Sequence, residues 1–239
     1  MADVVQRWRV VYQRGREAAD LAQRGELEAW EAALVASGLP VAMTGGEHPR
    51  PRIAMPPPLP AGLTGEHELL DVLFVERRDS ATVRERLAAV LPPDHGLVDL
   101  FDVWIGTPPL PAQVVAADYA VTIHPGAGHD ALRSAVARVL DTRRIERTRR
   151  RGDRATTYDL RPFILGLGVE ASASPAAVLR MRLLVHPEQG TGRPDEVLAT
   201  VGDELGEPLE LVAGVRTRIW TADETLPPPF PGVVAAPAR

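Results

Sequence analysis

Arginine residues gather in one segment of the second half of the chain. Between Arg143 and Arg154, seven arginines stand against Glu146 and Asp153, which gives this segment a formal charge of +5 in a chain whose net charge is −5. Alternate side chains of an extended hairpin project from one face, and a guanidinium group donates in a geometry that fits phosphate oxygens. The segment is therefore a candidate ridge for contacts with a nucleic-acid backbone.

Two other interpretations of this basic segment stay open beside contact with RNA. Its charges are equally typical of a solvated hairpin, and they would also suit an acidic partner protein. Nucleic-acid sites often add aromatic rings on which bases stack, and here only Tyr158 lies nearby. The candidate nucleic-acid contacts are Arg147, Arg149, Arg150, Arg151, Arg154 and Arg161.

A second candidate is the run His48-Pro49-Arg50-Pro51-Arg52. Two prolines restrict the backbone of a loop that presents His48 together with Arg50 and Arg52. Such a loop could bind an anion, so Arg50 and Arg52 join the nucleic-acid candidates.

Carboxylates offer only weak candidates for catalysis. An acid–base pair needs two groups in different environments, and Asp71 and Asp159 stand singly in or beside predicted strands. With His48 they are the catalytic candidates for an RNA-modifying or RNA-cleaving activity in a cleft between two halves of the chain. Asp159 could instead form a structural pair with Arg161.

Missing residue types exclude whole classes of chemistry for this chain. It has no Cys, hence no disulfide, thiolate zinc site or Cys-ligated iron–sulfur cluster, and all 27 of its Lys+Arg residues are Arg. A metal site is not expected, because no third ligand accompanies His124 and His129, and the chain lacks a nucleotide-binding glycine fingerprint. We expect no cofactor, and with no signal peptide or long apolar run we expect a cytoplasmic protein.

The elements that must position these residues follow from the hydrophobic periodicity. In the first half, alternation predicts strands at 7–12, 52–55, 69–75 and 97–105, and helical spacing predicts helices at 18–37 and 80–91 with Ser80 as N-cap. The second half repeats the order, with strands at 118–124, 163–169, 178–186 and 211–220, helices at 130–140 and from 194, and an added hairpin at 144–160. The prediction is an α+β fold of two tandem ferredoxin-like βαββαβ halves with antiparallel sheets.

Proline-rich stretches mark the expected boundaries of these halves. Prolines at 56–60, 107–111 and 226–231 cannot lie inside helices or central strands. We expect a first half at 1–106, a Pro-rich linker at 107–115, a second half at 116–223 and a Pro-rich disordered tail at 224–239.

Several segments, in this order and spacing, resemble the radical SAM-linked protein family. The resemblance covers roughly residues 5 to 222 and rests on 37–42 (Ser-Gly-Leu-Pro-Val-Ala), 48–53 (His-Pro-Arg-Pro-Arg-Ile), 59–63 (Leu-Pro-Ala-Gly-Leu), 68–72 (Glu-Leu-Leu-Asp-Val), 158–162 (Tyr-Asp-Leu-Arg-Pro), Arg193-Pro194 and Arg216-Thr217. The chain departs from the family at 21–27 (Leu-Ala-Gln-Arg-Gly-Glu-Leu), where many members carry Leu-Ser-His-Leu-Asp, and at 46–48 (Gly-Glu-His), where they carry Gly-Phe-Asn.

The resemblance implies a bacterial context of RNA processing or modification without supplying a reaction. Members of the family occur alone or joined to the C-terminal side of cobalamin-binding radical SAM proteins, often beside a gene for an RNase E/G-type ribonuclease. We therefore expect a non-catalytic, RNA-binding accessory module that acts with such a radical SAM protein or ribonuclease. An RNA-modifying or RNA-cleaving enzyme and a protein-binding scaffold are the alternatives.

Overall fold

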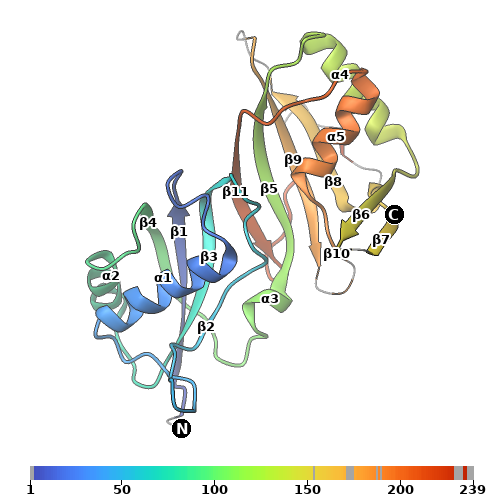
Figure 1. The fold of residues 1–239 in the computed structure, drawn as a ribbon. Helices are drawn as coiled ribbons and strands as arrows, with labels where there is room; N and C mark the ends of the chain where they lie inside the picture. The colour runs from blue at the N-terminus through green and yellow to red at the C-terminus, as the bar shows by residue number, and fades with distance from the viewer. Residues whose placement is uncertain are drawn as a thin grey trace. The chain divides into compact units, whose positions relative to one another are not determined.

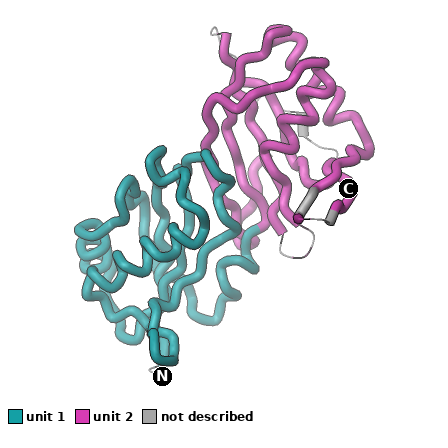
Figure 2. Tube along the Cα trace, viewed as in Figure 1, with its two compact units in different colours: residues 1–114 teal, residues 115–239 magenta. Residues whose placement is uncertain are grey.

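The computed structural model describes residues 3–152, 154–170, 175–186, 188, 190–228 and 234–235. Of Arg150, Arg151, Arg154, Val234 and Ala235 it describes the backbone alone. The chain divides into two compact units, residues 1–114 and 115–239 (Figure 2). Its class is mixed α+β, with mostly antiparallel pairing of strands, as the sequence predicts.

The first unit places two helices over one face of an antiparallel sheet (Figure 1). The strands lie in the order β4-β1-β3, with β2 paired to β3. The elements are β1 (Gln6–Arg14), α1 (Gln23–Ala36), β2 (Ile53–Ala54), β3 (Thr64–Phe74), α2 (Ser80–Ala88), β4 (His95–Asp102) and α3 (Leu110–Gln113).

Alternation along β1 explains this packing. Trp8, Val10 and Tyr12 belong to a buried core that also contains Trp30 and Leu34 of α1 and Val83 and Leu87 of α2. Arg7 and Arg9 alternate with them and therefore project from the opposite face of the sheet. Both arginines are nevertheless buried, which requires polar partners on that face.

The second unit repeats this strand order with additions. Its strands lie in the order β12-β8-β9-β5-β11, with β10 paired to β9, while β6 and β7 form a separate two-stranded sheet. The elements are β5 (Val114–Ile123), α4 (His129–Asp141), β6 (Glu146–Arg151), β7 (Arg154–Asp159), the 3-10 helix η1 (Arg161–Phe163), β8 (Ile164–Glu170), β9 (Ala177–His186), β10 (Gly190–Thr191), α5 (Pro194–Leu205), β11 (Ala213–Thr221) and β12 (Val234–Ala235).

The helix ends show where local signals succeed and where distant contacts override them. Pro194 opens α5 as expected, and Gly206 ends it in the left-handed conformation, with φ of 82°. The N-cap of α2 is Asp79 and not Ser80, because the Asp79 carboxylate accepts from the Thr82 N–H at 2.9 Å. Helix α1 begins at Gln23 and not at residue 18.

Contacts of two side chains, Asp94 and Arg14, explain this late start of α1. The Asp94 carboxylate accepts from the N–H groups of Glu17 and Ala18 at 2.7 and 3.2 Å. The Arg14 guanidinium donates to the carbonyl oxygens of Ala18 and Leu21. Together these contacts hold residues 16–20 in turns.

Neither α3 nor the short strands β10 and β12 are predicted by the sequence patterns. Helix α3 lies inside the segment 107–115 for which proline predicts a linker, and β12 lies inside the predicted tail. In the described part of the chain, none of the helices combines the length and apolarity needed to cross a membrane.

Candidate functional site

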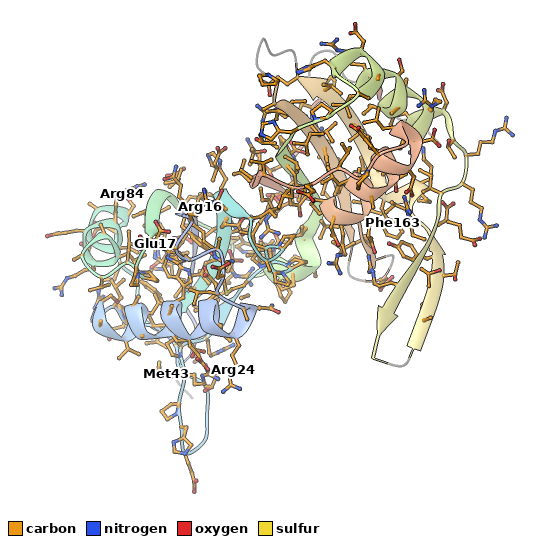
Figure 3. All side chains as sticks on the ribbon, turned by 45° about the horizontal axis from the view of Figure 1, so that its top comes forward. Arg16, Glu17, Arg24, Met43, Arg84 and Phe163 are labelled. Carbon is orange, nitrogen blue, oxygen red and sulfur yellow. The ribbon has the colours of Figure 1, made fainter. Side chains whose placement is uncertain are left out.

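The arginine-rich segment forms the β6–β7 hairpin, in register from Glu146 opposite Asp159 to Arg151 opposite Arg154. Gly152 supplies a positive φ of 60° at the turn. The far end of the hairpin extends beyond the rest of the second unit (Figure 3). A hairpin is thus confirmed, and its arginines fall into two groups.

The first group is bound to helix α5. Arg147 donates through Nε and Nη2 to Thr200 Oγ1 at 2.9 and 2.7 Å, and through Nη2 to Asp203 Oδ2 at 2.7 Å. Arg149 forms a bidentate pair with Glu196, at 3.0 Å from Nε to Oε1 and 2.8 Å from Nη2 to Oε2. These two side chains therefore attach the hairpin to α5.

Tyr158 completes the contact between the hairpin and α5. The Arg149 guanidinium carbon lies 5.0 Å from the centre of the Tyr158 ring. Burial, and then the neighbouring Glu196 carboxylate, raise the pKa of Tyr158 to about 12. Burial also opposes ionisation of Glu196, but hydrogen bonds from Arg149 and Tyr158 outweigh it and lower the Glu196 pKa. Glu196 is therefore ionised and Tyr158 neutral near pH 7.

The second group lies at the turn. The side chains of Arg150, Arg151 and Arg154 lie outside the described part of the structure, as does Asp153.

Asp159 and Arg161 stabilise the base of the hairpin. Asp159 Oδ1 accepts from the N–H groups of Ile145 and Arg161 at 2.9 and 3.0 Å. The buried Arg161 guanidinium donates to the carbonyl oxygens of Leu140 and Ile164, both at 3.0 Å at the closest atoms. Both residues thus hold backbone together in the second unit, and Arg161 is not at the surface.

In the 48–52 loop, the candidates have unlike environments. His48 is exposed, and Arg50 forms an ion pair with Glu31 of α1, at 2.6 Å from Nη2 to Oε2. Arg52 is half-buried, and its N–H donates to the Ala42 carbonyl at 2.7 Å. Met43, labelled at the base of this loop in Figure 3, pairs with Pro51 through a β-bridge.

Asp71 is buried on the face of the first unit's sheet that is opposite to α1 and α2. Its carboxylate accepts from Arg9 Nε and Nη2 at 2.7 and 3.0 Å, and Arg9 Nη2 also donates to Gln113 Oε1 at 3.2 Å. Arg9 and Asp71 are directly opposed in the register of β1 and β3. Asp71 is therefore far from solvent and fully engaged with an arginine.

The second unit has a matching pair with the charges exchanged. Asp118 of β5 and Arg182 of β9 are opposed in register and form a buried bidentate pair at 2.7 and 2.8 Å. Trp220 Nε1 donates to the same carboxylate at 2.9 Å, and Arg182 also donates to the Pro227 carbonyl. An Arg–Asp pair thus joins β1 to β3 in the first unit and β5 to β9 in the second.

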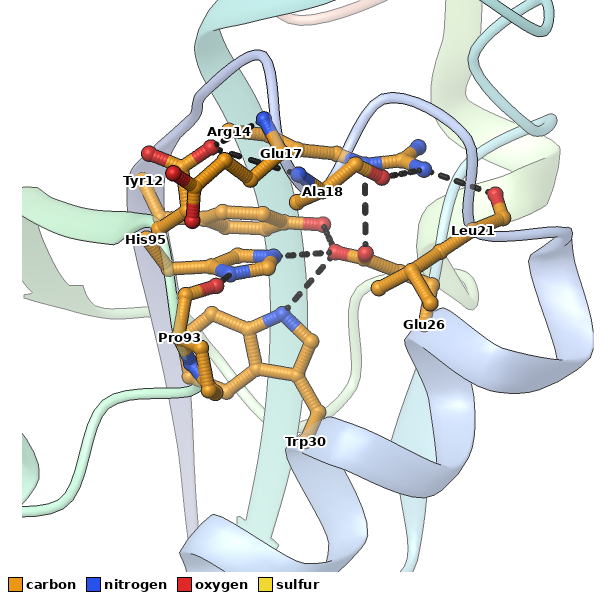
Figure 4. A network of polar contacts seen from close by, with 10 residues as sticks. Tyr12, Arg14, Glu17, Ala18, Leu21, Glu26, Trp30, Pro93 and His95 are labelled. Carbon is orange, nitrogen blue, oxygen red and sulfur yellow. Dashed lines mark hydrogen bonds and ion pairs between the residues drawn. The ribbon is translucent and has the colours of Figure 1, made fainter.

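The sequence analysis missed a buried network centred on Glu26 (Figure 4). Glu26 Oε1 lies 3.0 Å from Tyr12 Oη, 3.2 Å from Trp30 Nε1 and 3.0 Å from His95 Nε2, while Arg14 Nε lies 3.3 Å from Oε2. The sequence does contain one indication of this network: Glu26 and Trp30 are four residues apart and therefore share the apolar face of α1.

Protonation of this network follows from its geometry. His95 Nδ1 lies 2.7 Å from the Pro93 carbonyl, which can only accept, so Nδ1 carries a proton. Burial lowers the pKa of His95, but the bond to Glu26 outweighs burial and raises it. Burial likewise opposes ionisation of Glu26, yet His95, Arg14 and Tyr12 lower its pKa. Both shifts favour the charged pair, in which an imidazolium donates to a carboxylate inside the first unit.

Within the described residues, the His, Asp and Glu side chains form no group that could hold a metal ion.

Comparison with solved structures finds similar chains at low sequence identity. One belongs to a Cbf5-Nop10-Gar1 complex (10% identity, TM-score 0.48, covering 89% of this chain and 48% of that chain). Others belong to the archaeal box H/ACA sRNP Nop10-Cbf5 complex (10%, 0.47, 89% and 47%) and to an H/ACA RNP bound to a substrate RNA containing 2′-deoxyuridine (13%, 0.43, 82% and 43%). This chain thus spans about half the length of the solved chains it matches.

A search of curated proteins gives no match. Residues 7–194 match a family described as an uncharacterized protein conserved in bacteria (DUF2344). Because the match spans more than half of the chain, the chain belongs to this bacterial family of unknown function.

Proposed function

We propose that this protein is a non-catalytic accessory module that binds RNA through the arginines at the turn of the β6–β7 hairpin. The observation that carries the proposal is the attachment of the hairpin to α5. Arg147 and Arg149 each make charge-assisted bonds to α5, so the hairpin is held in a fixed direction. Strands that are already attached to α5 need less ordering when the hairpin binds a ligand.

The charge at the turn suits a phosphate backbone. Arg150, Arg151 and Arg154 accompany a single carboxylate, Asp153, in five consecutive residues. Arg147 and Arg149 contribute less, because α5 carboxylates neutralise them. The RNA contact proposed here is therefore the turn and not the whole ridge, with Arg50 and Arg52 as secondary contacts and Arg161 as a supporting residue.

The positions of the carboxylate candidates support a non-catalytic role. Asp71 is enclosed by Arg9, and Asp159 Oδ1 binds two backbone N–H groups. Asp71 is therefore not available to move a proton to or from a substrate, and Asp159 uses one carboxylate oxygen to hold the backbone. His48 is exposed in its loop, and among the described residues no hydrogen bond orients it as a base.

The proposed partner class rests on the resemblance to the radical SAM-linked family. The module would act with a radical SAM protein or an RNase E/G-type ribonuclease, in the cytoplasm, in RNA modification or processing. This chain has no Cys, so the cluster of a radical SAM reaction would be held by another chain.

We also propose that the two units are ferredoxin-like modules in tandem, at 1–106 and 116–223, with 107–115 as linker and 224–239 as tail. The strand order supports this. A ferredoxin-like sheet has its four strands in the order fourth, first, third, second. The first unit has β4-β1-β3-β2 and the second has β11-β5-β9-β8. In the first unit, the second strand is reduced to Ile53–Ala54.

Binding of a fluorescein-labelled single-stranded RNA of mixed sequence tests the proposed function. Replacement of Arg150, Arg151 and Arg154 by Ala should weaken binding at least about 10-fold and lower the slope of log affinity against log salt by about 2, since each phosphate contact on a single strand contributes about 0.7. The matched control replaces Arg24, Arg84 and Arg133, which are exposed on three other helices. Equal affinity of both variants would contradict the proposal.

A further inference from the structure

Exposed apolar side chains concentrate at the end of β4. Of 11 large hydrophobic residues exposed in the described part of the chain, four lie within 98–105, and they include both exposed aromatic residues. They are Val98, Phe101, Trp104 and Ile105, with exposed fractions of 36, 43, 76 and 41%. Together with Asp99 and Asp102 we call these residues the β4 strip. Clusters of this kind mark interaction sites on soluble proteins.

The loop that carries Trp104 is held in place by buried Arg7. Arg7 Nη2 donates to the Ile105 carbonyl at 3.2 Å, and Nη1 donates to the Pro108 carbonyl at 3.1 Å. The Thr107 N–H closes a turn onto the Trp104 carbonyl at 3.0 Å. The Trp104 ring lies over Gly106, where any Cβ would come within 2.5 Å of it. An exposed tryptophan is thus presented by an ordered backbone, as in binding hot spots.

The backbone edge of β4 is partly closed to strand addition. Strand β4 is the edge strand of the sheet in the first unit. The Leu100 N–H donates to its neighbour Asp99 at 2.7 Å, and Arg84 of α2 donates to the same carboxylate oxygen at 3.0 Å. Charged groups at an edge strand oppose the pairing of a further strand. A partner would therefore contact the side chains of the β4 strip and not extend the sheet.

The charge of the strip selects among partners. Residues 95–114 contain Asp99 and Asp102 and no arginine. Arg84 of α2 compensates part of the charge of Asp99, whose side chain stays 60% exposed, and Asp102 Oδ2 accepts from Gln6 Nε2 at 2.9 Å. A second copy of the strip would place carboxylate against carboxylate, and an RNA backbone would meet the same repulsion. A segment rich in arginine or lysine would instead find carboxylates beside an indole face, on which cations stack.

We propose that the β4 strip binds a basic, apolar segment of a partner protein, with Trp104 and Phe101 as the apolar contacts and Asp99 and Asp102 as the charge partners. The site lies in the first unit, so the proposal does not rest on RNA binding by the hairpin. It would make the protein a two-surface module, with an acidic, apolar surface for a protein and a basic one for RNA.

Fluorescence anisotropy with short labelled peptides tests this proposal on the full chain. A peptide of alternating arginine and leucine should bind, whereas peptides of alternating glutamate and leucine, or arginine and serine, should bind at least about 10-fold more weakly. Trp104→Ala with Phe101→Ser should weaken arginine–leucine binding at least about 10-fold. Asp99→Asn with Asp102→Asn should weaken it and reduce its salt dependence. Val35→Ser, at a residue 64% exposed on α1, is the matched control.

Three outcomes would overturn the proposal. One is that the Trp104 and Phe101 variant, folded by circular dichroism, binds the arginine–leucine peptide as tightly as the unaltered chain. Another is equal binding of the glutamate–leucine peptide. The third is that Trp104→Ala abolishes self-association in sedimentation velocity, which would assign the strip to a second copy. Testing each variant with RNA as well separates failure of this site from failure of the hairpin.

Discussion

At the scale of single residues, the buried Glu26–His95 pair couples stability to pH at both ends of the range. The His95 pKa is raised above 6.5, so its contribution is complete below that value and is lost as pH rises through the folded-state pKa. The Glu26 pKa is lowered below 4.5, so its contribution is present above that value and is lost as pH falls through the folded-state pKa. The pair therefore stabilises the first unit most between these limits.

Thermal unfolding followed across pH tests this coupling. We expect the unfolding temperature of the unaltered chain to decline on the alkaline side as His95 loses its proton. His95→Gln cannot titrate but can still donate to Glu26, so it should remove the alkaline decline and keep the acid one. Identical alkaline profiles for the two proteins would rule out His95 as the titrating group.

Asp71 offers a second test at this scale, because a structural role and a catalytic role predict different effects of its replacement on folding stability. Asp71→Ala leaves the buried Arg9 without its carboxylate and should cost about 3–5 kcal/mol of folding stability. Replacing Arg9 and Asp71 together by Leu and Leu should recover most of that loss, since well-packed apolar pairs substitute for buried ion pairs. Urea unfolding measures both, and an unchanged stability in Asp71→Ala would return Asp71 to the catalytic candidates.

At the scale of elements, the contact between the hairpin and α5 is reported by Tyr158. Its pKa of about 12 comes first from burial and then from Glu196. Glu196→Gln removes the negative charge, so the pKa of Tyr158 should fall toward its ordinary value of 10. Spectrophotometric titration measures it, with Tyr158→Phe to identify the signal among the three tyrosines. A pKa unchanged by Glu196→Gln would show that the hairpin is not attached there.

The sequence predicted elements well wherever the signal was local. The sequence patterns located the longer strands of both halves, and the arginine-rich run was correctly assigned to a hairpin. What it could not predict were the partners of those arginines, because Glu196 lies 47 residues from Arg149 and Asp203 lies 56 from Arg147. Pairing of this kind depends on how α5 packs and not on the pattern of either segment.

At the scale of the whole molecule, the mild net charge conceals two surfaces of opposite character. The arginine-rich turn belongs to the second unit and the acidic, apolar β4 strip to the first. The sequence pattern does not indicate the strip, because it predicts one continuous strand from Leu97 to Ile105. In the structure the strand ends at Asp102, and Trp104 and Ile105 belong to a loop held by Arg7.

The exchanged charges of the two buried pairs bear on how such a chain folds. Two modules of like strand order on one chain risk exchanging strands during folding. If β1 paired with β9, Arg9 would meet Arg182, and if β5 paired with β3, Asp118 would meet Asp71. Either mismatch would bury two like charges without a counter-ion, which is far costlier than the native pairing. The opposite order of charges in the two units thus disfavours the exchange of strands between them.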